Sequence, residues 1–197
     1  MSGTEGSTGS QSGRYILVMG VCGAGKSHVA HALAEALGGA FVEGDAFHPA
    51  DNVQRMASGR PLTDAMRLPW LQAVAAAARR AAEAMPENTA APVVIACSAL
   101  KRAYRDLLRA HLPGLAIVHL TGDRDVIAAR MARRDGHFMP ASMLDSQLAD
   151  LEVPGKDEAV TFDVAGSREA VVDRVIQFFR RSTAEDGSLP RHESSRA

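Results

Sequence analysis

Short apolar runs alternate with longer amphipathic stretches along most of the chain. Five of these runs are rich in large apolar or β-branched residues, which is typical of buried strands: YILVMG, AFVEGD, PVVIACS, LAIVHLTG and VTFDVAG. The stretches between them repeat apolar residues at helical spacing. We expect helices over residues 26–37, 68–85, 100–111, 123–134, 141–151 and 168–180. The alternation predicts an α/β fold in three layers, with a parallel sheet between helices on both faces.

The two ends of the chain lack this pattern. Residues 1–13 and 182–197 are small and polar without a hydrophobic period, a composition that predicts disordered tails. The part between them, residues 14–181, is long enough for one domain with a sizeable core and too short for two ordinary domains. We therefore expect a single active site, at the carboxyl ends of the parallel strands.

Composition and charge narrow the classes of function. Hydrophobic residues make up 46% and charged residues 23% of the chain, with a formal net charge of -1. This balance argues against a disordered chain and against a protein that binds nucleic acid, and it favours a small-molecule partner. No apolar run is long enough to cross a bilayer and the N-terminus lacks the pattern of a signal peptide, so we expect no membrane association and a cytoplasmic location. The two cysteines, Cys22 and Cys97, are expected to be reduced thiols.

The segment GVCGAGKS carries the strongest local signal. It fits the pattern G-x-x-x-x-G-K-[ST] between a predicted strand and a predicted helix, which is the setting of a phosphate-binding P-loop. In such a loop backbone N–H groups surround phosphate oxygens, Lys26 reaches the outer phosphates and Ser27 offers its hydroxyl to Mg²⁺. A glycine-rich turn without a ligand is the alternative, but the chain has only three lysines, so a lysine at this position favours the P-loop. The predicted ATP site consists of Gly20, Val21, Cys22, Gly23, Ala24, Gly25, Lys26 and Ser27.

A carboxylate and an imidazole follow the second predicted strand. Asp45 and His48 lie just after its last residues, where the acceptor of a transferred phosphate would lie in a parallel sheet. Asp45 is a candidate to orient or deprotonate an attacking hydroxyl, or to hold Mg²⁺ through water. The alternatives are a helix cap for Asp45 and a surface or core-edge position for His48. Their position beside a P-loop favours the functional interpretation.

The third predicted strand ends at Ser98, where many P-loop enzymes carry an aspartate for magnesium. The missing acid argues against an ATPase or a GTPase, and it leaves Ser27 and Asp45 as the main metal-side groups. Lys101 and Arg105 follow at i,i+4 spacing and share one helix face, which suits an anionic substrate. The alternative is a solvated basic face.

Further arginines precede a glycine in the second half of the chain. Arg130 and Arg134 share one helix face, and Gly136 is a candidate hinge for a lid. Such arginines neutralise charge on a transferring phosphoryl group, a role worth about a thousandfold in rate in related chemistry. Exposed charge is the alternative, and we assign Arg133, on a different face, to it.

Several long motifs occur in a fixed order within residues 15–179: GVCGAGKS, EGDAFHPADNVQRMASGRPLTD, RLPWL, CSALKRAYRDLLR, RMARRDGHFMP and QLADLEVP. Together they resemble the motifs of the gluconokinase family of P-loop kinases. The resemblance implies transfer of the γ-phosphate of ATP, with Mg²⁺, to the 6-hydroxyl of D-gluconate. It also implies a P-loop kinase fold with a mobile helical lid, and a homodimer.

The resemblance and the local patterns together assign the expected roles. We expect catalysis from Lys26, Asp45, Arg130 and Arg134, and Mg²⁺ binding from Ser27 and Asp45. We expect substrate binding from Asp45, His48, Arg67, Ser98, Lys101, Arg105 and His137. Further positions that match the family motifs are Asn52, Trp70, Gln147 and Pro154.

The chain departs from the family pattern at two points, and the residues alone leave other functions open. Ala65 and Met66 stand where the family has an acidic run before Arg67, and Arg55 stands where lysine is frequent. A shikimate or nucleoside monophosphate kinase is the first alternative, because pocket charges specify an anion and not which one. A non-catalytic nucleotide-binding module is the second, and the missing acid and the basic groups argue against it.

Overall fold

A five-stranded parallel sheet forms the centre of the protein in a computed structural model that describes residues 14–87, 89–132 and 141–186. The strands lie in the order β2-β3-β1-β4-β5, and each of the four pairings between neighbours is parallel. They are β1 (Tyr15–Met19), β2 (Ala40–Glu43), β3 (Val93–Ala96), β4 (Ala116–Thr121) and β5 (Val160–Asp163). The parallel sheet predicted from the five apolar runs is confirmed.

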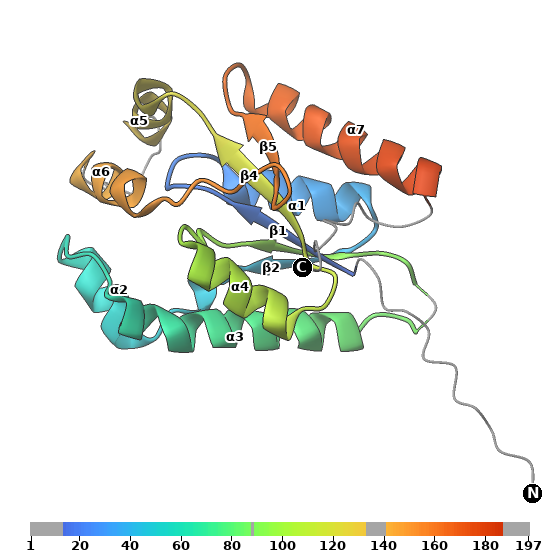
Figure 1. Ribbon diagram of the computed structural model, residues 1–197, viewed down its shortest axis with the longest axis horizontal. Helices are drawn as coiled ribbons and strands as arrows, with labels where there is room; N and C mark the ends of the chain where they lie inside the picture. Colours follow the sequence, from blue (N-terminus) through green and yellow to red (C-terminus); the bar gives the residue numbers. More distant parts are fainter. Residues whose placement is uncertain (1–13, 88, 133–140, 187–197) are drawn as a thin grey trace, which may run out of the picture.

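Helices cover both faces of this sheet. In Figure 1, α1 and α7 lie on one face and α3 and α4 on the other, while α2, α5 and α6 gather at the end toward which the strands point. The helices are α1 (Lys26–Ala36), α2 (Ala50–Ala57), α3 (Asp64–Glu83), α4 (Arg102–His111), α5 (Arg124–Ala132), α6 (Ala141–Asp150) and α7 (Arg168–Asp186), with a 3₁₀ turn η1 (Gly44–Phe47). The predicted three-layer α/β fold is therefore confirmed.

The alternation of side chains along the central strand builds two separate cores. In β1, Ile16 and Val18 pack among the residues of α1 and α7, whereas Leu17 and Met19 pack among those of α3 and α4. All four side chains are fully buried, because a parallel sheet covered on both faces leaves no strand face to water. The same burial explains why β1 and β3 are continuously apolar, whereas the edge strands β2 and β5 are only partly buried and contain polar residues.

Several element boundaries differ from the sequence prediction. Helix α3 begins at Asp64 rather than at residue 68, because the hydroxyl of Thr63 accepts a hydrogen bond from the Met66 N–H and caps the helix. Helix α7 continues to Asp186, beyond the predicted end at residue 180. Helix α2 and the turn η1 were not predicted, since their residues are too polar and too few to show a period. The predicted tail 1–13 lies outside the described residues.

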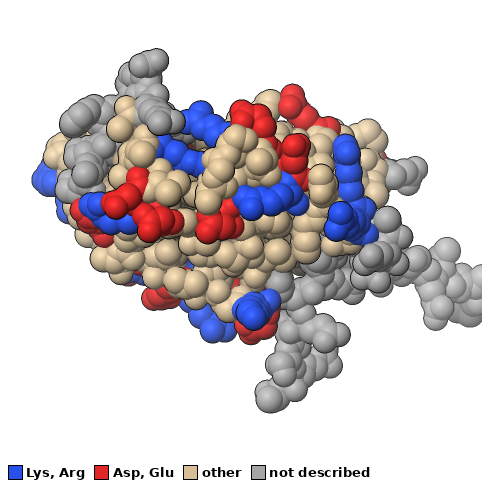
Figure 2. All heavy atoms as spheres, turned by 90° about the horizontal axis from the view of Figure 1, so that it is seen from above, with Lys and Arg blue, Asp and Glu red and all other residues tan. Residues whose placement is uncertain are grey.

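The surface carries mixed charge. Figure 2 shows acidic and basic side chains interspersed over the face seen from above, in keeping with the formal net charge of -1. In the part of the chain that the structure describes, no helix combines the length and the apolar character that a membrane span requires.

Candidate active site

The P-loop joins β1 to α1 and depends on three glycines. Gly20, Gly23 and Gly25 have φ angles of 143°, 80° and 96°, which side chains rarely allow. At Gly20 a Cβ atom would also lie 2.4 Å from the backbone oxygen of Leu120 on the neighbouring strand. The glycines therefore let the backbone turn tightly into the N-terminus of α1, where the first N–H groups have no partner within the helix.

Two helices from later in the chain contact this loop. The backbone N–H of Cys22 donates to Oε1 of Gln147 on α6 at 2.7 Å, and the Cys22 sulfur lies 3.7 Å from that of Met131 on α5. A Cβ atom at Gly23 would lie 2.5 Å from Met131 Cγ. The ammonium of Lys26 donates to the carbonyl of Val21 at 3.0 Å, within the loop itself. Polar groups of the protein thus occupy the Cys22 N–H and the Lys26 ammonium in this structure.

The ends of β1, β2 and β3 lie close enough for their charges to act on one another. Cys97, directly after β3, is fully buried, and this burial raises the pKa of its thiol to about 12. The negative charge of Asp45 raises this pKa further, and the positive charge of Lys26 opposes it. Lys26 and Asp45 therefore both lie near the end of β3.

Asp45 lies on η1 with an exposed side chain, beside a histidine that is held by packing. The Asp45 carboxylate is 71% exposed, and its Oδ1 lies 3.9 Å from Nε2 of His48. His48 is buried and stacks on Trp70 with 4.1 Å between ring centroids, and Nδ1 lies 3.4 Å from the Asn52 amide. Burial lowers the pKa of His48, and Asp45 partly opposes the shift. Asp45 is thus accessible to a ligand, and His48 is a neutral neighbour.

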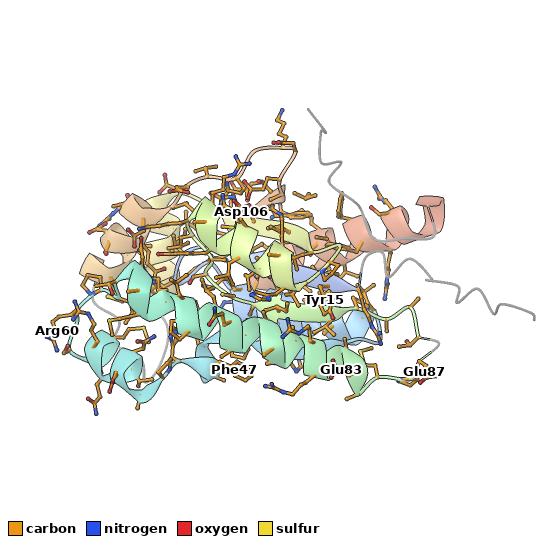
Figure 3. The ribbon with its side chains drawn as sticks, turned by 60° about the horizontal axis from the view of Figure 1, so that its bottom comes forward. Tyr15, Phe47, Arg60, Glu83, Glu87 and Asp106 are labelled. Atoms are coloured by element: carbon orange, nitrogen blue, oxygen red, sulfur yellow. The ribbon has the colours of Figure 1, made fainter. Side chains whose placement is uncertain are left out.

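The indole of Trp70 holds the turn η1, which carries Asp45. Nε1 of Trp70 donates to the carbonyl of Gly44 at 2.8 Å, and the indole is almost fully buried between η1 and α3. Figure 3 shows Phe47, at the end of η1, lying alongside α3. Trp70 therefore packs the core and holds the turn that carries Asp45.

A cluster of charged and hydroxyl groups forms the next part of the site. The ammonium of Lys101 lies 2.8 and 3.0 Å from the two carboxylate oxygens of Asp64, and the Tyr104 hydroxyl donates to the same carboxylate at 2.6 Å. Arg67 donates to the Tyr104 oxygen and to Asp150 of α6, each at 3.1 Å. The hydrogen bonds from Lys101 and Tyr104 lower the pKa of Asp64. Two predicted substrate residues, Lys101 and Arg67, therefore lie together.

Sequence reasoning did not assign a role to Asp64, Tyr104 or Asp150. Their contacts join segments between 37 and 83 residues apart in the chain, so no local pattern brings them together. The one sequence feature that could have drawn attention to these residues is the position of Asp64, directly after Thr63, which caps α3.

Arg105, which was also predicted to bind substrate, is bound elsewhere in this structure. Its side chain is 1% exposed and its guanidinium is bound to Glu158. Lys101 and Arg105 therefore differ in burial: Lys101 is partly exposed at the charged cluster, and Arg105 lies in the interior. Ser98, before them, is half-buried.

The lid residues are only partly described. Arg130, on α5, donates from one guanidinium nitrogen to the carbonyls of Val164 and Gly166, beyond β5. Arg134 and His137 lie outside the described residues.

The residues at the loop suit a magnesium ion held mainly by phosphates. Ser27 is in the first turn of α1, and Asp45 presents an accessible carboxylate. The described residues contain no group of three or more His, Cys, Asp or Glu side chains that would form a metal site by themselves. This agrees with the usual binding of Mg²⁺ in kinases, through one or two protein oxygens, substrate phosphates and water.

Comparisons with known proteins give the family. The model of the AAA domain family matches residues 16–154. The gluconokinase of Gluconobacter oxydans is 46% identical over 175 residues, which cover 88% of this chain and 93% of that protein. The thermoresistant gluconokinase of Escherichia coli is 44% identical, with 85% and 93% covered. The crystal structure of a gluconokinase from Sinorhizobium meliloti superposes with a TM-score of 0.67 at 47% identity, and the match covers 86% of this chain and 97% of that one.

These similarities extend over nearly the whole domain and include the P-loop. The resemblance of the sequence motifs is thereby confirmed, and the chain belongs to the gluconokinase family of P-loop kinases.

Proposed function

We propose that the protein transfers the γ-phosphoryl group of ATP to the 6-hydroxyl of D-gluconate, giving 6-phospho-D-gluconate and ADP. One observation carries the proposal: the P-loop, the exposed carboxylate of Asp45 and the cationic groups of Arg67 and Lys101 gather at one edge of the sheet. Relatives that match over most of the chain bear the name gluconokinase, which favours this acid over other anions.

At the nucleotide end, loop residues 20–27 hold the phosphates through backbone N–H groups. Lys26 exchanges its bond to the Val21 carbonyl for the β- and γ-phosphate oxygens and stabilises the charge that develops there. Ser27 and Asp45 would hold Mg²⁺, which when bound neutralises phosphate charge.

At the acceptor end, the substrate is an anion with several hydroxyl groups. Lys101 and Arg67 bind its carboxylate in exchange for their present partners Asp64 and Asp150, and His48 and Ser98 orient its hydroxyls. Asp45 takes the proton of the attacking substrate hydroxyl. The oxygen of that hydroxyl bonds to the γ-phosphorus, while the bond between this phosphorus and the ADP oxygen breaks. Arg105 is not included among the substrate contacts.

The lid supplies further groups in this proposal. Arg134 neutralises charge on the phosphoryl group during its transfer, and His137 contributes to substrate binding. Arg130 takes part only if it leaves the carbonyls that it binds beyond β5. We also propose that the protein acts as a homodimer, and in the cytoplasm, where ATP is supplied.

An assay of ADP release across a panel of acceptors tests the proposal. We expect kcat/KM for gluconate to exceed the values for shikimate and AMP by at least about a hundredfold, because a site built for several substrate hydroxyls rejects analogues that leave its polar groups unpaired. A kcat/KM for shikimate or AMP equal to that for gluconate would contradict the assignment of gluconate as the substrate. ADP release that no acceptor stimulates would favour the non-catalytic module.

A further inference from the structure

Arg105 forms a buried two-point ion pair in the middle of the molecule. On α4, its Nε and Nη2 donate to the two carboxylate oxygens of Glu158 at 2.5 and 3.1 Å. Its side chain is 1% exposed and that of Glu158 is 11% exposed. This geometry uses one edge of the planar guanidinium and fixes its orientation.

The remaining nitrogen of the guanidinium binds the loop between β3 and α4. Nη1 of Arg105 donates to the carbonyl of Leu100 at 2.8 Å and to that of Ala99 at 3.4 Å. These two residues lie between Ser98 and Lys101, which we place at the acceptor. Arg105 therefore contacts the loop from its buried side, and the two candidate substrate residues lie at the ends of the bound segment.

The loop has a backbone conformation that needs support from outside. Ala99 has a φ of 41°, and it is the one residue other than glycine with a positive φ in the described parts of the chain. A side chain disfavours this region, so the conformation persists where surrounding contacts impose it. Ala99 is completely buried, and its carbonyl is one of the two that Arg105 binds.

A second contact supports the same segment. The backbone N–H of Glu152, just after α6, donates to the Leu100 carbonyl at 3.1 Å, and its carboxylate accepts from the Arg102 N–H at 2.6 Å. Figure 1 shows the chain between α6 and β5 passing beside α4. That passage carries both Glu152 and Glu158, so the loop is held between α4 and this segment.

We propose that Arg105 is a positioning residue for the acceptor site: it holds the loop from Cys97 to Lys101 in the shape that places Ser98 and Lys101 toward the substrate. The inference rests on the proposed function, because it takes this loop as part of the acceptor site. An arginine is required, since a lysine at this place keeps the charge but cannot bind a carboxylate at two points and two carbonyls at once.

The test compares Arg105→Lys with a control that loses charge at the same carboxylate. Arg109 donates to the same Glu158 oxygen at 3.1 Å but contacts neither Ala99 nor Leu100, so Arg109→Ala is the matched control. We expect Arg105→Lys to lower kcat/KM for gluconate by about tenfold to a hundredfold, the usual effect of a displaced substrate contact. We expect the dissociation constant for a nonhydrolysable ATP analogue to change less than about twofold, and Arg109→Ala to change both quantities by less than about twofold.

Each result of this comparison decides the inference. Unchanged kinetics in Arg105→Lys, or an equal loss in Arg109→Ala, would reduce Arg105 to a stabilising residue and overturn the proposal. Should Arg105→Lys not fold, Glu158→Gln removes the charge but keeps the shape, and it must show the same selective loss. The proposed substrate is judged separately on the wild-type protein: if another acid replaces gluconate there, the same comparison is made with that acid.

Discussion

Single residues in the P-loop show how function constrains a side chain. The three glycines are required by backbone geometry and by the approach of Leu120, whereas the role proposed for Lys26 depends on its charge. Its ammonium donates to a backbone carbonyl of its own loop in this structure.

Replacing Lys26 should separate catalysis from folding. We expect Lys26→Ala to melt within a few degrees of the wild-type protein, with kcat for ADP release lowered by about a hundredfold to a thousandfold, because a charge that stabilises the transition state is lost. Lys156→Ala, at an exposed lysine far from the loop in sequence, is the control and should keep its activity. Near-normal turnover in a folded Lys26→Ala protein would remove Lys26 from the mechanism.

At the scale of elements, the sequence predicted what local patterns determine. The strands could be predicted from apolar runs. The P-loop could be predicted from the spacing of its glycines and lysine, because that spacing lets the backbone and the ammonium surround a phosphate. The sequence predicted that Lys101 and Arg105 share a helix face, but not that Lys101 is partly exposed while Arg105 is buried. Contacts such as that of Gln147 with Cys22 join residues 125 positions apart, and they depend on how the helices pack.

The strand β4 carries a polar residue that its apolar pattern hides. His119 is 1% exposed, and neither of its ring nitrogens has a hydrogen-bond partner among the described residues. Burial lowers its pKa below the ordinary value of 6.5, and the nearby charge of Arg105 lowers it further. The folded protein therefore keeps this imidazole neutral.

Replacing His119 should stabilise the protein, and more so in acid. Below pH 6.5 the unfolded chain takes up a proton that the folded chain does not, so the free energy of unfolding falls as the pH drops toward the lowered pKa. We expect His119→Leu to raise the free energy of unfolding by about 1 kcal/mol at pH 7.5, since a buried polar group without a partner is removed. The gain over wild type should increase at pH 5.5.

Urea unfolding at the two pH values measures both effects of His119→Leu. The control is His31→Leu on the exposed side of α1, which should change the stability by less than about 0.5 kcal/mol. A destabilised His119→Leu protein would show that the imidazole has a favourable partner after all.

At the scale of the whole molecule, α6 connects the two halves of the active site. Its Gln147 accepts from the P-loop, and its Asp150 binds Arg67 in the acceptor cluster. Under the proposed function, phosphates that enter the loop compete with Gln147 for the Cys22 N–H, and a sugar acid that binds Arg67 competes with Asp150. Binding of either ligand therefore loosens α6, and so weakens the α6 contact that competes with the other ligand.

The two substrates should consequently bind with positive coupling. We expect a nonhydrolysable ATP analogue to lower the dissociation constant of gluconate by about fivefold or more, and gluconate to lower that of the analogue by the same factor. Titration calorimetry with and without the second ligand measures both. In Gln147→Ala the coupling should shrink, and equal dissociation constants in the wild-type protein would contradict the role of α6.

The spacing of Gln147 and Asp150 also limits how the chain can change length. The two residues are three positions apart, so they lie on one face of the helix, one turn from each other. Each residue of an α-helix turns about 100°, so one inserted or deleted residue between them would rotate one contact away while the other stayed in place. An insertion or deletion there would disconnect the nucleotide from the acceptor, although every residue of both sites was still present.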